Sequence, residues 1–469
     1  MPRTVPAAAV AQEARAILVL ATPLVVGQLA AFGMNVVDTL MSGWLSPATL
    51  AAVALGSTAW MGLALFVLGT LLALPPFVSQ LVGAGRQREA GPVTWQAFWL
   101  AQVMALGLMV AVRGVRPVLH WIGVEAALVP DVMGYLQAVA WGAPAFCGYL
   151  CLRFFSEGWG YTRPVMYFGF VGVVLNVPAN WVLMYGAFGL PGLGATGCGL
   201  ATALVFWLQF VALAVYVSRR PRYEDAGLFR RVAPPDRAVM ASLLAVGLPI
   251  GTAIFMEGSL FTGITLLIGS LGTETVAAHQ VAINFSSILF MVPLGTAMAI
   301  TVRVGHAVGR GDPNAARLAG LTGVGMIALV QCAWAALMLF APGAITRIYT
   351  DDPAVRAQAA VLLMIAAGFQ LPDGIQVGMA GALRGMKDTF KPMLLTVVAY
   401  WCLGLPTGWW MGFRAGYGAP GLWLGLIAGL GTAALLLSWR FARVSRHVPA
   451  PVPGEEETLV EALDPRGQP

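Results

Sequence analysis

The chain has 469 residues, of which 58% are hydrophobic and only 10% are charged. A soluble domain carries about 25% charged residues, so this composition excludes a protein whose whole surface faces water. We therefore expect an all-α integral membrane protein that crosses the bilayer several times. The formal net charge of +6 lies in the loops between apolar runs, which argues against a nucleic-acid partner and for contact with membrane lipid.

Stretches without charged residues mark the expected membrane spans in chain order. Residues 16–85 hold a single charge, Asp38, and fit two spans, at 16–40 and 49–75. The uncharged stretch between Arg163 and Arg219 fits another two. The other stretches fit one span each, at 90–112, 132–152, 238–273, 275–302, 318–346, 357–383, 392–413 and 415–439; they are uncharged except for Glu257 and Asp373. Because a helical span needs about 20 apolar residues, we expect twelve spans.

The basic residues predict the orientation of these spans. If the N-terminus lies inside, 22 of the 27 Lys and Arg residues fall on the inner side. The five on the outer side are Arg113, Arg116, Arg347, Arg356 and Arg414. Because short cytoplasmic loops are enriched in Lys and Arg, both termini are expected to be cytoplasmic.

The two halves of the chain resemble each other at a constant offset of 226 residues. The matched positions are Pro23 with Pro249, Ala51 and Ala52 with Ala277 and Ala278, and Gly83 and Gly85 with Gly309 and Gly311. With six spans in each half, the repeats have the same orientation and are related by an axis along the membrane normal. Such repeats are typical of secondary transporters, in which two lobes enclose a central cavity.

The longest charged loop separates the two halves and sets the expected domains. These are an N-terminal lobe at 1–218, a cytoplasmic linker at 219–238, a C-terminal lobe at 239–446 and a disordered cytoplasmic tail at 447–469.

Three acidic residues interrupt the apolar spans: Asp38, Glu257 and Asp373. None has a basic residue in the same predicted span. A charge near the bilayer centre costs at least about 2.5–3.5 kcal/mol, so it persists where it lines a cavity and binds something. These acids therefore predict a site for a cation, which could be a proton, a metal ion or an organic cation. The alternative is that they lie at water-exposed helix ends.

A second set of polar residues lies in the segment NVPAN. Asn176 and Asn180 are four residues apart and share one helix face, and Pro178 between them lacks a backbone N–H. Their amide oxygens suit a hard cation or a protonated carboxyl group. A hydrogen bond that only packs the helices together explains them equally well.

The sequence contains no nucleophile–base set, phosphate-binding glycine loop or ATPase motif, so we expect neither an enzyme nor a cofactor. Energy must come from an ion gradient or from another protein. Among the many apolar side chains, Met256 and Phe369 lie close in sequence to the acids and are expected to line the substrate cavity. A flippase for lipid-linked precursors is the alternative function, but it should carry basic residues in its cavity to hold phosphate groups.

The sequence resembles a known family, the multidrug and toxic compound extrusion (MATE) transporters, in their bacterial NorM-like branch. The resemblance covers residues 15–440. It is carried by the segments VVDTLMSG (36–43), NVPANWVLMYGAFGLPGLGATGCGLATALVFW (176–207), GLPIGTAIFMEGSLF (247–261), AAHQVAINFSSILFMVPLG (277–295) and LPDGIQVGMAGALRGMKDTFKP (371–392).

The resemblance implies a fold and an activity. It implies a V-shaped pair of six-helix lobes in the bacterial inner membrane. We expect the protein to be monomeric. It also implies multidrug efflux of cationic or amphipathic organic compounds, by antiport with Na⁺ or H⁺ through alternating access.

The resemblance also assigns roles to individual residues. Asp38, Asn176 and Asn180 match a cation or proton site in the N-terminal lobe, where Asp38 is also expected to contact substrate. Glu257 and Asp373 match the coupling carboxylates of the C-terminal lobe, with Na⁺ as a possible ligand. Asp351 and Asp352 match drug-contacting acids at an outer helix end. Some members have a tyrosine where this chain has Phe369, which leaves the choice of ion open.

Overall fold

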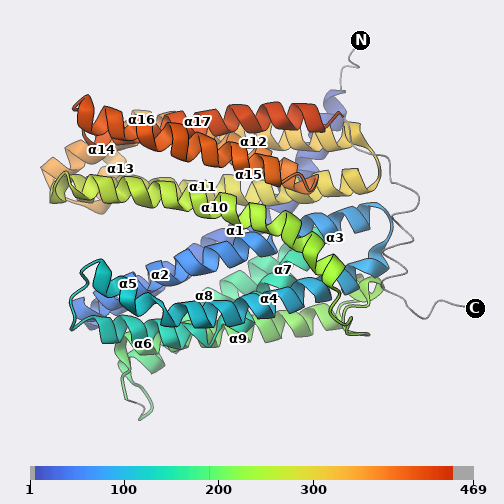
Figure 1. Ribbon diagram of the computed structural model, residues 1–469, viewed down its shortest axis with the longest axis horizontal. Coiled ribbons are helices and arrows are strands. Elements are labelled where there is room, and N and C mark those ends of the chain that lie inside the picture. Colours follow the sequence, from blue (N-terminus) through green and yellow to red (C-terminus); the bar gives the residue numbers. More distant parts are fainter. Residues whose placement is uncertain (1–5, 190, 447–469) are drawn as a thin grey trace, which may run out of the picture. The chain divides into compact units, whose positions relative to one another are not determined.

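A computed structural model describes residues 6–189 and 191–446 of the chain (Figure 1). Over these residues every regular element is helical, which confirms the predicted all-α class. The predicted tail at 447–469 lies outside the described residues.

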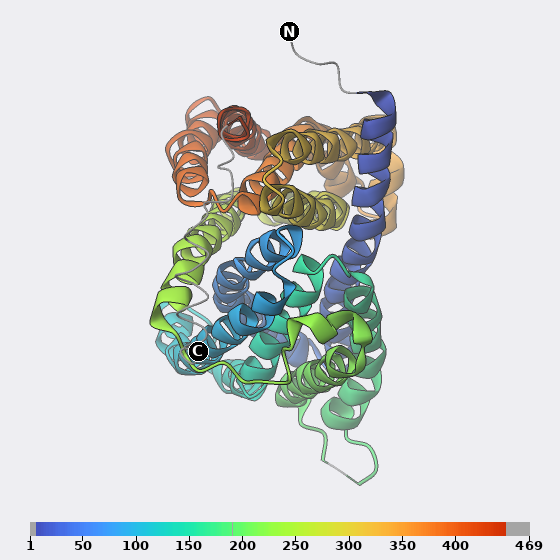
Figure 2. The same ribbon diagram turned by 90° about the vertical axis from the view of Figure 1, so that its right-hand side faces the viewer.

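The helices of the first half are α1 (Ala7–Leu45), α2 (Pro47–Leu71), α3 (Leu74–Gly83), α4 (Ala90–Arg113), α5 (Val115–Trp121), α6 (Val129–Ala140), α7 (Ala143–Gly158), α8 (Arg163–Tyr185) and α9 (Gly194–Arg219). Those of the second half are α10 (Arg237–Gly269), α11 (Thr273–Gly309), α12 (Pro313–Phe340), α13 (Pro342–Tyr349), α14 (Pro353–Gly385), α15 (Phe390–Val397), α16 (Leu405–Trp409) and α17 (Ala419–Val444). Figure 2 shows many of them nearly end-on.

Eleven helical segments within the described residues are long and apolar enough to cross a membrane. The pair α6 and α7 makes a twelfth if it is counted as one broken span, so the predicted number of spans is confirmed. The predicted continuous span at 132–152 is instead bent by 47° between Ala140 and Ala143. The bend falls just before Pro144, whose missing N–H cannot continue the hydrogen-bond ladder of α6.

The eleventh span is irregular around a proline. Residues Phe390–Arg414 alternate between α-helix and the π-helical segments η3 (Val398–Gly404) and η4 (Trp410–Arg414). Pro406 lies between these two segments and removes one backbone donor from the helix. Wider π turns are frequently found at functional sites, and Tyr400 lies in the first of these two segments.

The described residues divide into two compact units. The C-terminal unit comprises residues 6–25 and 252–446, and the N-terminal unit comprises residues 26–251 without residue 190. The divisions fall within α1 and α10, two residues after Pro23 and Pro249, and they are again 226 residues apart. The two repeats are therefore divided at equivalent positions, whereas the predicted boundary lay in the loop 219–238.

Packing at the start of α1 explains why the first part of this helix belongs to the C-terminal unit. Glu13 accepts two hydrogen bonds from Arg303 of α11, at 2.8 and 2.6 Å. One turn further along α1, the side chain of Ile17 lies beside Gly323 of α12.

Packing before and at the start of α10 explains its place in the N-terminal unit. The side chain of Gln96 on α4 donates to the carbonyl oxygen of Pro234 at 2.8 Å. Its amide oxygen accepts from the backbone N–H of Asp236 at 2.7 Å. Further along α10, a Cβ atom on Gly247 would lie 2.2 Å from the carbonyl oxygen of Thr70. In each repeat, the first half of the first long helix thus belongs to the unit formed mainly by the other repeat.

Glycines allow close approach of the last two spans in the C-terminal unit. Gly404 and Gly408 face Gly425 and Gly429 of α17, and a Cβ atom on Gly425 would lie 2.4 Å from the Cα atom of Gly408. Small residues four apart on both helices are typical of tight helix pairs in membranes, where dispersion and weak hydrogen bonds replace the hydrophobic effect.

This contact gives a stability prediction. Gly425→Leu would force the backbones of the two helices apart, so we expect it to lower the free energy of unfolding by about 1–3 kcal/mol. The loss is measurable as a lower thermal unfolding midpoint of the detergent-solubilised protein. Gly431→Leu on the same helix is the matched control, because a Cβ atom there meets nothing within 4 Å. Equal losses in both variants would contradict the close-packing argument.

Candidate functional site

The structure places Asp38 in a buried polar site of the N-terminal unit. Its carboxylate is held by three helices, α1, α8 and α9. The side-chain amide of Asn180 donates to one carboxylate oxygen at 2.6 Å, and the hydroxyl of Thr202 lies 3.3 Å from the other. The same Asn180 amide donates to the side-chain oxygen of Asn176 at 3.1 Å. The predicted association of these residues is therefore present, and Thr202 is an addition.

Two atoms of this site lack a hydrogen-bond partner among the described residues. They are the amide nitrogen of Asn176 and the side-chain oxygen of Asn180, and both are fully buried. An unpaired buried polar atom costs about 1–3 kcal/mol unless something binds it. The carboxylate of Asp38 and the oxygen of Asn180 are both acceptors, so the site is chemically suited to a cation or a proton.

The second acidic site lies within the C-terminal unit, and Gln376 connects its two carboxylates. The amide nitrogen of Gln376 donates to Glu257 at 2.9 Å and lies 3.4 Å from a carboxylate oxygen of Asp373. The hydroxyl of Tyr400 donates to the amide oxygen of Gln376 at 3.0 Å, which fixes the direction in which the amide points. Helices α10 and α14 and segment η3 thus meet at one bridging side chain.

This arrangement brings together the two acids that the sequence selected. Neither carboxylate has an ion-pair partner within hydrogen-bonding distance among the described residues. One amide group supplies only two N–H donors, so two ionised carboxylates here remain short of positive charge. The described residues hold no group of three or more His, Cys, Asp and Glu side chains that could bind a metal ion. A Na⁺ ion bound here would therefore need amide, hydroxyl or carbonyl oxygens in addition to the two acids.

Asp351 and Asp352 lie at the start of α14, away from either acidic site in sequence. Asp352 is the N-cap residue and accepts from the backbone N–H groups of Ala354 and Val355, at 2.8 and 3.3 Å. This is an ordinary helix-capping role. Both side chains are exposed, so contact with a substrate remains a prediction for them.

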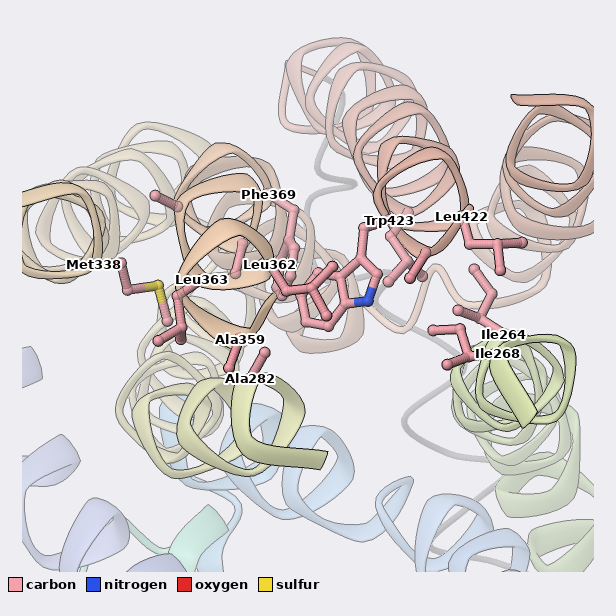
Figure 3. Close-up of a cluster of buried hydrophobic side chains, with 14 of the residues drawn as sticks. Ile264, Ile268, Ala282, Met338, Ala359, Leu362, Leu363, Phe369, Leu422 and Trp423 are labelled. Atoms are coloured by element: carbon pink, nitrogen blue, oxygen red, sulfur yellow. The ribbon is translucent and has the colours of Figure 1, made fainter. Parts of the chain in front are cut away.

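The two apolar residues predicted to line a cavity have different surroundings. Met256 is half-buried on α10, next to Glu257, and its carbonyl oxygen lies 3.4 Å from the indole nitrogen of Trp401. Phe369 is only 2% exposed and packs against Trp423 in the apolar core of the C-terminal unit (Figure 3). Its ring is covered by the core, so this conformation favours a packing role for Phe369.

Three residues of the acidic sites had not been predicted: Thr202, Gln376 and Tyr400. Gln376 follows Asp373 by three residues and so shares its helix face, which was a usable signal. Nothing in the sequence places Tyr400 beside an acid on another helix. The predicted span at 357–383 ends one residue before Arg384 and so leaves it in the following loop. In the structure α14 continues to Gly385, and Arg384 is only 9% exposed.

The sequence of residues 23–182 and 249–410 matches the MatE protein family twice. The two matches begin 226 residues apart, as the repeat predicts, and together they contain all five predicted ion-site residues. The chain belongs to the MATE family. The probable multidrug resistance protein NorM of Xanthomonas campestris pv. campestris is 45% identical over 94% of this chain and 96% of its own length. The multidrug resistance protein PmpM of Pseudomonas aeruginosa is 44% identical, with 92% of each chain covered.

Solved structures agree with this assignment. The MATE transporter NorM-NG, solved in complex with a dye and a monobody, is 33% identical with a TM-score of 0.78, over 92% of this chain and 94% of that one. The eukaryotic MATE transporter AtDTX14 has a TM-score of 0.84 at 19% identity, over 93% and 99% of the two chains, and it shows the shared fold. MATE proteins are multi-pass multidrug efflux transporters. The predicted NorM-like resemblance and the absence of an enzyme activity are therefore confirmed.

The hydrogen bond from Tyr400 gives a prediction for this MATE protein. Tyr400→Phe removes only the hydroxyl that orients Gln376. Under the ion coupling proposed in the next subsection, we expect a loss of about 1 kcal/mol in ion affinity, or about fivefold. The measurement is the ion concentration that gives half-maximal efflux of a fluorescent organic cation from proteoliposomes. Tyr417→Phe is the matched control, because Tyr417 is 60% exposed. An unchanged half-maximal concentration in Tyr400→Phe would show that Gln376 is oriented without it.

Proposed function

We propose that this MATE protein is a secondary active multidrug efflux transporter. It exports cationic or amphipathic organic compounds in exchange for Na⁺ or H⁺ by alternating access. The observation that carries the proposal is the pair of carboxylates, Glu257 and Asp373, joined through one neutral amide within a span region. Such a pair needs positive charge from outside the protein, and both a coupling ion and an organic cation can supply it.

Competition for that negative charge couples the two fluxes. When an ion occupies the Glu257–Asp373 pair, the charge that attracts a cationic drug is neutralised. When drug occupies the site, the ion is released. A ligand shifts the balance between the inward-facing and outward-facing states only if it binds one of them more tightly than the other. Ion and drug must therefore favour opposite states. The same reasoning applies to Asp38 with Asn176 and Asn180 as a second ion site.

The substrate class follows from this chemistry and from the relatives. Organic cations suit acidic sites, and one relative has been solved in complex with a dye. Asp38, Asp351, Asp352 and Met256 are the residues we propose for substrate contact. Phe369 retains the role predicted from sequence only if its core cluster opens during transport.

We also propose that the chain is monomeric and lies in the bacterial inner membrane with both termini in the cytoplasm. The support for the orientation is the distribution of the 27 basic residues, of which 22 fall on the side of the N-terminus when the spans are counted along the chain. This distribution also favours contact with anionic lipid on that side.

The direct test is ethidium efflux from proteoliposomes that contain the wild-type protein. A Na⁺ gradient and a proton gradient are imposed separately, with the membrane potential held at zero. We expect one of the two gradients to drive ethidium against its own gradient, which also identifies the coupling ion. No ethidium movement under either gradient would reject the proposal, and translocation of a lipid-linked phosphate substrate would then be measured next.

A further inference from the structure

A hollow lies in the N-terminal unit at the point where α9 ends and the linker begins. It has a volume of about 210 Å³ and is lined by the last residues of α9 and by linker residues as far as Arg230. The charged residues among them are Arg219, Arg220, Arg230 and Glu224. Three positive charges and one negative charge leave a formal charge of +2 around the hollow. The hollow is therefore suited to an anion, on the side of the membrane predicted to be cytoplasmic.

The linker that forms one wall of the hollow is held against the N-terminal unit at two points. Tyr223 is buried, and its hydroxyl lies 2.6 Å from that of Ser156 on α7. The carbonyl oxygen of Leu228 accepts a hydrogen bond from the indole N–H of Trp95 on α4 at 2.7 Å. Between these points, Gly227 has a left-handed backbone conformation (φ 59°) that turns the chain back. The hollow is therefore built into the folded N-terminal unit.

Two of the three arginines are not neutralised by an acid. Arg230 forms an exposed ion pair with Glu224. Arg219 has no ion-pair partner among the described residues. The guanidinium group of Arg220 lies over the ring of Tyr216 on α9, 4.8 Å from the ring centroid. This contact fixes the group in place and leaves its positive charge uncompensated. Arg219 and Arg220 thus supply the net charge of the hollow.

An apolar stripe on α9 leads to the same hollow. Its four side chains are between 41% and 52% exposed and are spaced four, three and four residues apart: Leu204, Leu208, Val211 and Val215. This spacing places them on one helix face, and exposed apolar side chains within a span contact lipid chains. The next positions on that face are Ser218 and Arg219, which both line the hollow. A lipid chain that lies along the stripe therefore brings its headgroup to the arginines.

We propose that this hollow is a binding site for the headgroup of an anionic glycerophospholipid of the cytoplasmic leaflet. Arg219 and Arg220 bind the phosphate group, whose oxygens match the paired N–H donors of a guanidinium group. The stripe on α9 holds one of the lipid chains. A pocket that encloses a drug-sized ligand has a volume of about 300–1,000 Å³, so the smaller hollow suits a headgroup and not an exported compound.

Basic loop residues whose only role is to set the orientation of the spans give a different expectation. The excess of Lys and Arg on the cytoplasmic side explains why this loop is basic. It does not explain why two uncompensated arginines meet in one hollow at the end of an exposed apolar stripe. If the arginines act only through their total charge, removing any two exposed arginines should weaken lipid binding equally. Comparison of two double variants therefore separates the two roles.

The experiment measures the dissociation constant of the first lipid bound to the full-length solubilised protein, by native mass spectrometry. The probes are phosphatidylglycerol, which is anionic, and phosphatidylcholine, which has no net charge. We expect the wild-type protein to prefer phosphatidylglycerol. Each arginine beside an anionic lipid contributes about fivefold, so Arg219→Gln with Arg220→Gln should weaken phosphatidylglycerol binding by about 25-fold. Binding of phosphatidylcholine should change little. Arg113→Gln with Arg116→Gln is the matched control, because it removes two exposed arginines of the same unit from the predicted outer side.

Equal losses in the two double variants, or no preference of the wild-type protein for phosphatidylglycerol, would overturn the inference. Displacement of phosphatidylglycerol by millimolar inorganic phosphate would show a site for free anions, and this also rejects a lipid site. If the double variant does not fold, Arg219→Gln alone is measured, and an affinity loss of about fivefold is expected. This inference goes beyond the proposed antiport and does not depend on it, because the binding is measured at equilibrium without an ion gradient.

Discussion

Glu257→Gln is expected to abolish ion-driven efflux while leaving the protein folded. Glutamine has nearly the same shape as glutamate, and its side-chain oxygen can still accept the 2.9 Å hydrogen bond from Gln376. The charge is lost, however, and Asp373 is then the one acid that remains of the pair. The pair attracts the coupling ion less strongly, so we expect drug movement to be uncoupled from the ion gradient.

We expect the concentrative efflux of ethidium to fall by at least about tenfold, which lies within the usual range of coupling free energies. The assay is efflux under the gradient that drives the wild-type protein, with passive ethidium exchange measured in parallel. Exchange should persist, because the variant still binds and releases drug. Glu274→Gln is the matched control, since Glu274 is an exposed residue in the first turn of α11. Wild-type efflux by Glu257→Gln would remove this residue from the coupling mechanism.

The acids of both sites could be predicted from sequence because a charge within an apolar span is costly and therefore conspicuous. The same argument cannot find Gln376 or Tyr400. A neutral amide or a phenol in a span is often only a packing contact between helices. Their roles follow from hydrogen bonds between α10, α14 and η3, which are far apart in sequence and adjacent only in the folded protein. Arg384 was missed for a simpler reason: a basic residue near the end of an apolar run was assigned to the next loop.

The fold shows a similar division between local and long-range information. The repeat and the number of spans follow from local patterns of charge and proline. The assignment of residues to compact units does not, because a repeat shows which segments are alike and not which segments pack together. The start of α1 joins the C-terminal unit through Glu13 and Arg303, and only the structure reveals this pairing. Pro144 is a local signal for the break between α6 and α7. The size of the bend cannot be predicted, because an apolar run has the same pattern in a straight helix and in a bent one.

Asp38→Asn tests the second ion site and should have a different effect from Glu257→Gln. The oxygen of the new amide can still accept the hydrogen bond from Asn180, and its nitrogen can donate to the hydroxyl of Thr202. The N-terminal site therefore keeps its packing and loses its one net charge. We expect efflux to fall by roughly tenfold. We also expect the number of ions exchanged per ethidium to fall by one, because the C-terminal site still needs its ion.

This number is measured in proteoliposomes with the membrane potential held at zero, as the slope of the logarithm of the ethidium ratio against the logarithm of the ion ratio at which net ethidium flux stops. Asp131→Asn is the matched control, since Asp131 is an exposed residue in the first turn of α6 within the same unit. A slope that falls by one in Asp38→Asn would show that Asp38 holds a coupling ion of its own. A wild-type slope and rate in Asp38→Asn would instead assign Asp38, Asn176 and Asn180 to helix packing, and all coupling would then rest on the net charge around Glu257. The two acidic sites are therefore distinguishable by ion count even where both variants transport slowly.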